Sequence, residues 1–217
     1  MDEYEKILSK QRLNKYIREQ DNGNLILAIN RYKWNIEISR AFYPALNIIE
    51  VSLRNRTHKA ISSYLNDEKW LENFSVHEQK FKLPFSREKV VKAMQELTLK
   101  KKPIEEPRLI AELNFGFWTS FYDNRYEQMW RSKNGLALVF PNMFRRNRTR
   151  SKLSKTLNRI RDLRNRIFHY EPIFHWHDLD KHYDRITECA SWISPKAKTL
   201  ILNCDNFKEV MAKKPSV

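Results

Sequence analysis

Glycine and cysteine are both scarce in this chain. Only three of the 217 residues are glycine, whereas average proteins use roughly 7%. Hairpin-rich β folds place glycine at their turns, so the scarcity favours a helical fold. The two cysteines, Cys189 and Cys204, are too few for a disulfide framework and are typical of a reducing compartment.

Long apolar runs are absent as well. The run Leu25–Ile29 is as long as any in the chain, and a transmembrane helix needs roughly 18 residues. The first ten residues, MDEYEKILSK, are mixed and lack the apolar centre of a secretory signal. We therefore predict a cytoplasmic protein without a membrane partner.

Acidic residues are outnumbered by basic ones. The chain holds 41 Lys and Arg against 26 Asp and Glu, which gives a formal net charge of +15. Such a balance indicates an anionic partner, and nucleic acid is the first candidate. The hydrophobic content of 41% excludes a disordered chain, which lacks the apolar mass to offset its ordering entropy.

Helical spacing of apolar residues covers most of the chain, and no stretch alternates convincingly as a strand. Pro44 interrupts one apolar stripe, and because proline disrupts a helix interior, we predict two helices there. Ser86 is the expected N-cap of a later helix. The predicted helices are 4–20, 25–41, 43–65, 87–100, 109–122, 151–168, 179–193 and 195–203.

We expect one helical domain over residues 1–217. Its core is built from about 25–66 and 108–193, and a connector over 67–107 carries one helix. Residues 66–85 are predicted to be irregular, and 194–217 to form a C-terminal helix and tail. The aromatic block 115–122 is expected in the core because it continues around a helix.

Positive charge is concentrated in residues 145–166, which carry eight Arg and two Lys against one acid, Asp162. Crowding of like charges opposes folding unless an anion relieves it. Arginine suits bidentate contact with phosphate, so we predict an RNA-binding surface, with a solvated helix face as the alternative. The candidate RNA-binding residues are Arg145, Arg146, Arg148, Arg150, Lys152, Lys155, Arg159, Arg161 and Arg166.

A cluster of residues that could act in catalysis lies at the end of the 151–168 helix. Arg164 falls on the apolar stripe of that helix, and Asn165 and His169 are four residues apart on one face. A His at a helix C-terminus is suited to proton transfer near neutral pH, and an Arg can stabilise a phosphorane. These residues suit RNA cleavage without a metal or cofactor. Alternatively, His169 caps its own helix and Arg164 forms a core salt bridge.

The pattern Arg164-Asn165-x-x-x-His169 resembles the signature of HEPN domains. Further segments, 41–61, 112–130, 136–142 and 163–175, resemble the Abi-like (abortive infection, AbiD/AbiF type) branch. Tyr170 departs from that branch, where a second His often stands.

The resemblance implies an all-α, HEPN-like helical bundle with additional helices and a long irregular connector. It also implies a homodimer with metal-independent endoribonuclease activity, acting in phage defence or as a toxin paired with an RNA or protein antitoxin. Two copies of His169 across the two-fold axis would then act as base and acid, and Arg164 would face the subunit seam.

Glu50, Arg54 and His58 form a second polar row at spacing i, i+4, i+8. A surface ion pair between Glu50 and Arg54 explains this row simply. The alternative is that Glu50 or Arg54 lines the cleft or orients Arg164. Tyr170, beside His169, is a further supporting residue.

Other functions remain open at this point. His169, His175, His177, His182 and Cys189 lie near one another in sequence, but they lack the spacing of a zinc site, so we predict no metal. A non-catalytic RNA-binding component on the same scaffold is the first alternative to an enzyme. A helical DNA-binding regulator is the second.

Overall fold

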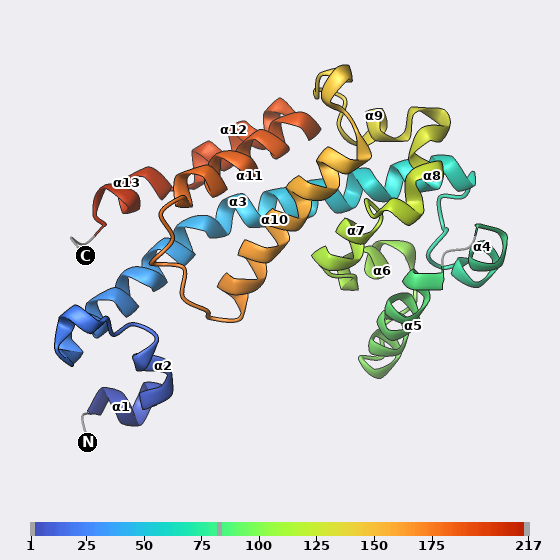
Figure 1. The fold of residues 1–217 in the computed structure, drawn as a ribbon. Coiled ribbons are helices and arrows are strands. Elements are labelled where there is room, and N and C mark those ends of the chain that lie inside the picture. The colour runs from blue at the N-terminus through green and yellow to red at the C-terminus, as the bar shows by residue number, and fades with distance from the viewer. Residues whose placement is uncertain (1–2, 82–83, 215–217) are drawn as a thin grey trace.

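The computed structural model describes residues 3–81 and 84–214. Within these residues every regular element is a helix and no strand is present (Figure 1). The all-α prediction is therefore confirmed. Buried side chains between Tyr16 and Val210 form a single hydrophobic cluster.

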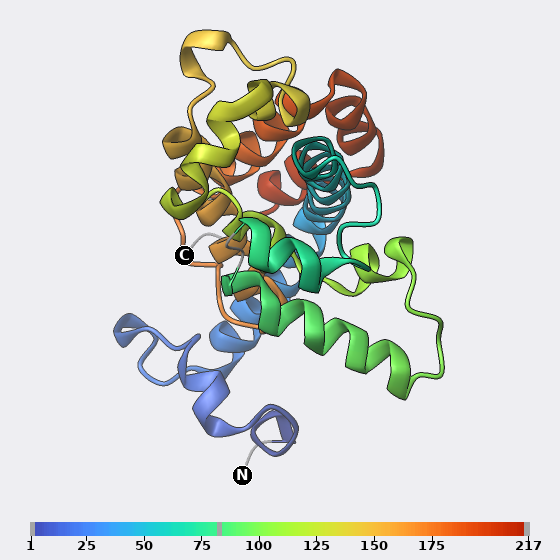
Figure 2. The ribbon, with the colours of Figure 1, turned by 90° about the vertical axis from the view of Figure 1, so that its right-hand side faces the viewer.

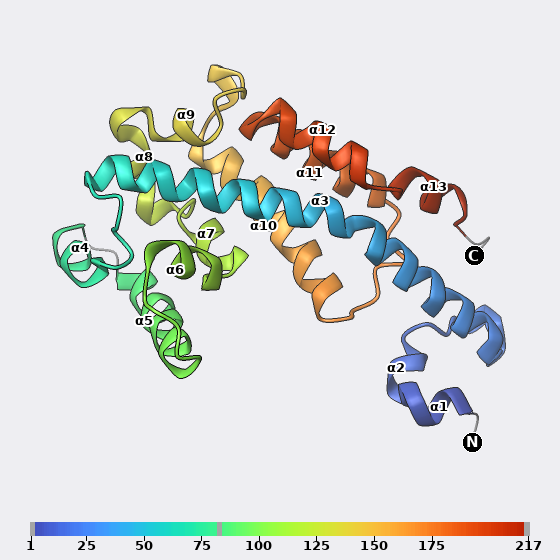
Figure 3. The same ribbon diagram turned by 180° about the vertical axis from the view of Figure 1, so that it is seen from behind.

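The central element is α3, Leu25–Leu65, a continuous helix of 41 residues that runs through the middle of the molecule (Figure 3). The prediction of two helices separated at Pro44 was wrong. Proline removes one helical hydrogen bond, but Phe42, Ala45 and Leu46 around it are fully or almost fully buried. Packing on both sides of Pro44 thus maintains the helix despite that loss.

The C-terminal helices cover one side of α3. They are α10 (Arg150–Phe168), α11 (Leu179–Ile193), α12 (Pro195–Cys204) and α13 (Phe207–Ala212), and α10 crosses α3 while α11 and α12 follow it (Figure 1). The first three match their predicted positions within a residue or two. The fourth, α13, was expected to be tail, and Phe207 anchors it by stacking on Tyr183 with ring centroids 4.2 Å apart.

The N-terminal segment is broken where one helix over 4–20 was predicted. It forms α1 (Glu3–Leu8), α2 (Lys10–Asn14) and a 3₁₀ turn over Glu19–Asp21. Ser9 adopts a left-handed φ of 64° and its side chain caps α2, which ends the first helix. Asp21 forms a buried bidentate ion pair with Arg31 of α3, and this pair fixes the segment to the central helix.

The connector is more regular than predicted. It holds α4 (Phe74–Phe81) and α5 (Pro84–Leu99), and α6 (Glu106–Glu112) begins at its end, so the expectation of a long irregular connector with one helix was wrong. Ser86 lies inside α5 rather than at its cap. Trp70, Leu71 and Phe74 are buried as expected, whereas the side chain of Phe81 lies outside the described part.

The predicted helix over 109–122 is two helices. Leu113 is extended after α6, and the Asn114 side chain then caps α7 (Phe115–Ser120) by accepting the Phe117 N–H at 2.9 Å. The aromatic side chains of this block are buried, as predicted. Viewed along α3, this region, the C-terminal helices and the α4–α6 segment surround the central helix (Figure 2).

Two short helices, α8 (Glu127–Arg131) and α9 (Gly135–Val139), follow α7. Three 3₁₀ turns, Asn124–Tyr126, Ser132–Asn134 and Arg145–Asn147, adjoin them. The loop between α9 and α10 projects from the body of the molecule (Figure 1, Figure 2).

Candidate functional site

Arg164 of α10 lies against Glu50 of α3. The Arg164 Nε is 3.5 Å from the Glu50 Oε2, and the two side chains are 24% and 23% exposed. The Arg164 guanidinium also lies 4.3 Å from the centroid of the Phe168 ring. The arginine on the apolar stripe of α10 therefore finds a carboxylate within its own chain, on the helix that α10 crosses.

This arrangement decides between the two interpretations of the 50–58 row. Glu50 pairs with Arg164, and no ion pair between Glu50 and Arg54 occurs in the described residues. The Arg54 Nε is buried and has no hydrogen-bond partner. The expected Glu50–Arg54 ion pair is therefore not formed, and Glu50 contacts Arg164 instead.

His58, the third member of that row, lies on α3 and contacts the connector. Its Nε2 lies 2.6 Å from a carboxylate oxygen of Glu106, and its ring stacks on Trp70. The same carboxylate accepts the backbone N–H groups of Leu71 and Glu72. These contacts fasten the connector to α3, so we assign His58 a structural role.

His169 ends α10. Its backbone N–H donates to the Asn165 carbonyl at 2.9 Å, which places Asn165 and His169 one turn apart, as predicted. The His169 ring is exposed, and no side-chain hydrogen bond or ion pair reaches it within the described residues. An α-helix turns by about 100° per residue, so Arg164 and His169, five positions apart, point about 140° away from each other around α10.

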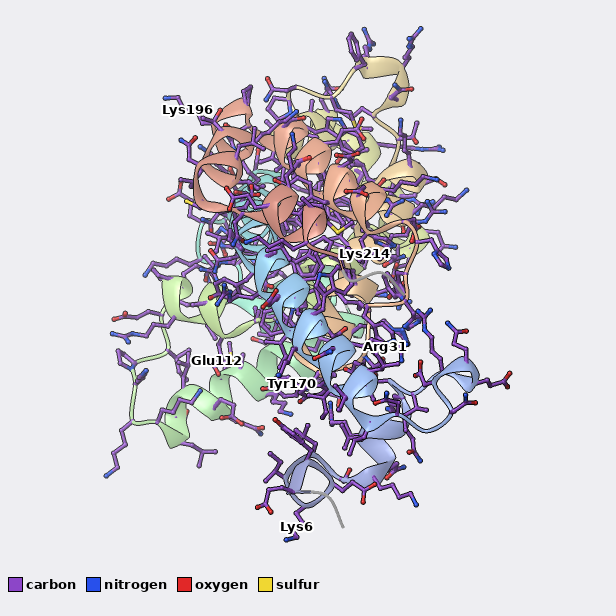
Figure 4. All side chains as sticks on the ribbon, turned by 90° about the vertical axis from the view of Figure 1, so that its left-hand side faces the viewer. Lys6, Arg31, Glu112, Tyr170, Lys196 and Lys214 are labelled. Carbon is purple, nitrogen blue, oxygen red and sulfur yellow. The ribbon has the colours of Figure 1, made fainter. Side chains whose placement is uncertain are left out.

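Hydrogen bonds from α2 and α3 fix the backbone that follows His169. Tyr170 has a left-handed φ of 58°, and its carbonyl accepts a hydrogen bond from Arg12 of α2 at 2.7 Å. The Oδ1 of Asn35 in α3 accepts the backbone N–H groups of Ile173 and Phe174 at 2.7 and 3.1 Å. Tyr170 itself projects beside α3, with 74% of its surface exposed (Figure 4).

Four of the predicted RNA-binding arginines have partners within the chain. Arg148 donates to the carbonyls of Pro141 and Met143, and Arg150 pairs with Glu127 and donates to the Tyr122 carbonyl. Arg161 donates to the Thr119 hydroxyl, and Arg166 lies 3.3 Å from a Glu171 carboxylate oxygen. These four contribute to the fold, which reduces the charge that is free for a ligand.

The remaining basic residues are exposed and have no carboxylate partner in the described chain. They are Arg145, Arg146, Lys152, Lys155 and Arg159. Lys152, Lys155 and Arg159 follow one another at steps of three and four, which places them on one face of α10. Continuing those steps passes the exposed acid Asp162 and then reaches Arg166 and His169, so a mainly basic face leads to the histidine.

Arg185 of α11 joins this face, although sequence reasoning missed it. It lines a groove of about 400 Å³ together with Lys152, Lys155 and Arg159. Burial, reinforced by the nearby charge of Arg159, lowers the pKa of Arg185 from its ordinary value. Arg185 is isolated in sequence, and only the packing of α11 against α10 brings it to the groove.

Phe144 is a second residue that the sequence did not single out. It stands in the projecting loop before Arg145 and Arg146, and 78% of its surface is exposed. Single-stranded nucleic acids bind to exposed aromatic rings flanked by cations. The combination Phe-Arg-Arg was a signal that could have been read from the sequence.

The histidines considered for zinc do not gather. His175 and His177 are exposed, His182 pairs with Asp178 at 3.7 Å, and Cys189 is fully buried. Among residues 3–81 and 84–214, no three His, Cys, Asp or Glu side chains form a group that would hold a metal ion.

Comparisons with protein-family models, with curated proteins and with solved structures find no match to this chain. In the part of the chain that the structure describes, no helix has the length and apolar character needed to cross a bilayer.

Proposed function

We propose that the chain is a HEPN-type, metal-independent endoribonuclease that acts as a homodimer, in phage defence or as a toxin. The observation that carries the proposal is the end of α10. There, Arg164 lies within ion-pair distance of Glu50, and the exposed ring of His169 stands at the end of a mainly basic face. The family resemblance of the 163–175 segment supports the same assignment.

The proposed reaction is attack of a ribose 2′-oxygen on the adjacent phosphorus. His169 accepts the 2′-hydroxyl proton, the bond from phosphorus to the 5′-oxygen breaks, and a second imidazole donates a proton to the departing oxygen. The products are a 2′,3′-cyclic phosphate and a 5′-hydroxyl. Arg164 stabilises the charge on the phosphorane oxygens, as arginine clamps do in phosphoryl transfer.

A second copy of the chain would supply the second imidazole. Each chain offers one His169 at this point, and it faces away from Arg164, so a single chain holds an incomplete set of groups. An apolar surface adjoins the same end of α10: Ile36, Tyr43, Phe168 and Tyr170 are all exposed and line a groove of about 390 Å³. Exposed patches of this kind mark interaction sites. An isologous two-fold contact at this surface would bring together the C-terminal ends of the two α10 helices, one from each copy.

RNA would approach along the basic face of α10. Lys152, Lys155, Arg159 and Arg185 line a groove without a carboxylate, which suits a phosphate backbone. Because this contact is electrostatic, RNA affinity should fall steeply as salt is raised.

The decisive test is the substitution His169→Ala, with His175→Ala as the matched control. Both histidines are exposed and lie six positions apart. Loss of the general acid–base group should slow RNA cleavage by about 10²–10⁴-fold while RNA binding persists, and the control should cleave normally. The proposal fails if wild-type protein binds RNA without cutting it, with or without EDTA, or if both variants lose activity equally.

A mixing experiment tests the shared site. Wild-type and His169→Ala chains are unfolded together, refolded at equal amounts and assayed. If both copies of His169 serve one site, only wild-type homodimers cut, and activity falls to about a quarter, whereas independent protomers retain about a half.

Tyr43→Glu should yield monomers in light scattering, while Leu200→Glu on exposed α12 should leave the dimer intact.

A non-catalytic RNA-binding component is the second candidate. The contact of Arg164 with Glu50 favours it, because a paired guanidinium has less charge to offer a phosphorane. This candidate predicts tight RNA binding through the α10 face, unchanged by His169→Ala, and no 2′,3′-cyclic phosphate product.

A further inference from the structure

A pocket of about 600 Å³ lies at the base of the projecting loop, at the opposite end of α10 from His169. Its walls come from α8, from Asn134 and the start of α9, and from Arg145 and residues 148–150. Small-molecule sites in proteins occupy roughly 300–1,000 Å³. The pocket is therefore large enough for a ligand the size of a nucleotide, and the proposed cleavage chemistry does not use it.

The charge in this pocket is strongly positive. Four arginines, Arg131, Arg145, Arg148 and Arg150, line it together with a single acid, Glu127. Glu127 is already occupied, because Arg131 and Arg150 both pair with it. The two remaining guanidiniums face the pocket without a carboxylate.

Those two guanidiniums differ in their surroundings. Arg148 donates to two backbone carbonyls, yet its Nε is buried and has no hydrogen-bond partner. Arg145 is exposed and has no side-chain hydrogen bond or ion pair within the described residues. One guanidinium held by carbonyls and one exposed guanidinium in the same lining suit a phosphate group, which accepts several charge-assisted hydrogen bonds at once.

Part of the lining is apolar. Trp130, Leu136 and Ala137 form it, and the Trp130 ring is held in place by stacking on Tyr122 with centroids 4.9 Å apart. Gly135 brings the turn close to this ring, since a Cβ there would lie 3.1 Å from the Trp130 Cε3. An inorganic anion would leave such a wall uncovered, whereas a nucleoside attached to the phosphate would cover it.

We propose that this pocket binds a nucleotide, with Arg145 and Arg148 on its phosphate and the Leu136–Ala137 wall against its base. The phosphate belongs either to a free nucleotide or to the 5′-end of an RNA chain. The site is separate from the His169 end of α10, so its occupation does not depend on cleavage.

Calorimetric titration of the 217-residue chain with AMP and with adenosine tests this assignment. AMP should bind at least about tenfold more tightly than adenosine. Adenosine lacks the phosphate, and the loss of one hydrogen bond between charged groups lowers the affinity by roughly tenfold. Arg145→Glu should weaken AMP binding by about tenfold or more. Arg146→Glu is the matched control, since Arg146 is an exposed neighbour outside the pocket lining, and it should change the affinity less than about threefold.

A second variant fills the pocket without a charge change. Ala137→Phe should abolish AMP binding while the thermal unfolding temperature stays near that of wild type. The proposal is overturned if AMP and adenosine bind alike, if Arg145→Glu and Arg146→Glu weaken binding equally, or if a folded Ala137→Phe protein still binds AMP.

Competition separates the two sources of phosphate. A 5′-phosphorylated RNA hexamer that displaces AMP, where the 5′-hydroxyl hexamer does not, identifies the RNA end as the ligand. AMP binding that neither hexamer displaces identifies a free nucleotide. The same titration on His169→Ala should be unchanged, so a failure of this proposal and a failure of the cleavage proposal are distinguishable.

Discussion

The contact of Glu50 with Arg164 should couple the two side chains energetically, and a double-mutant cycle measures this. Two unit charges 3.5 Å apart attract by about 5 kcal/mol at an effective dielectric constant near 20. Desolvation of both groups opposes this attraction, and exposed pairs retain only about 0.2–1 kcal/mol. With about three-quarters of each side chain covered, we expect a coupling of about 1–2 kcal/mol.

The cycle needs four proteins: wild type, Glu50→Gln, Arg164→Gln and the double variant. Urea unfolding followed by circular dichroism gives the free energy of unfolding of each, and the coupling is the departure from additivity. Each single variant should be less stable than wild type, because it leaves the other charge half-buried without a partner.

The exposed pair Lys6–Glu3 provides the control. Its Nζ–Oε2 distance of 3.4 Å nearly equals that of Glu50 and Arg164, but its side chains are 59% and 82% exposed. The same cycle there should give less than about 0.5 kcal/mol. Equal couplings for the two pairs would refute the reasoning that burial sets the strength of the Glu50–Arg164 contact.

Three further predictions concern the frame that holds the site. Asn35→Ala should lower the free energy of unfolding by about 2–4 kcal/mol in urea, because two buried backbone N–H groups lose their acceptor. Pro44→Ala should raise the melting temperature, since alanine restores the missing hydrogen bond of α3 and proline is about 3 kcal/mol less favourable in a helix interior; a lower melting temperature would contradict this. The hydrogen bonds from Arg31 lower the pKa of Asp21 from 3.8 to about 2, so this pair stabilises the fold above pH 3.8, and the stabilisation is lost as pH falls towards 2. Asp21→Asn should remove that part of the acid dependence, which unfolding at pH 5 and pH 2.5 measures.

The helices could be predicted from the sequence because helix signals depend on residues that are close together in the chain. The stripe Leu153, Leu157, Ile160 determines which face of α10 is buried, and Ser194-Pro195 marks the start of α12 within one residue. Such signals depend on neighbours three or four positions away, and they need no knowledge of the rest of the molecule.

Helix breaks and continuations were predicted less well, because long-range packing decides them. Pro44 is a breaker by local rules, yet the burial of Phe42 and Leu46 on either side of it keeps α3 intact. Ser9 and Asn114 are ordinary polar residues whose capping conformation ends one helix and begins the next. Whether such a residue caps a helix or continues it is settled by the tertiary contacts of both segments.

The sequence singled out Arg164 as a candidate site residue, but it did not determine which carboxylate lies against it. The position of Arg164 on an apolar stripe required a partner, and the sequence offered Glu50 only as one alternative. The crossing of α10 over α3 selects it. Arg185 illustrates the converse, since a lone arginine carries no signal until α11 places it beside Lys155 and Arg159.

The distribution of charge along α10 separates three tasks within one helix. Just before and at its first residue, Arg148 and Arg150 are committed to backbone carbonyls and to Glu127, so they fix the projecting loop as well as line the proposed nucleotide pocket. Along its middle, the basic residues of the exposed face have no carboxylate partner and remain free for a phosphate backbone. At its C-terminal end, Arg164 is neutralised while His169 stays open. Under the proposed function, RNA bound along α10 would reach a histidine that lacks a second proton-transfer group, and the apolar surface beside it would serve to bring one from another copy.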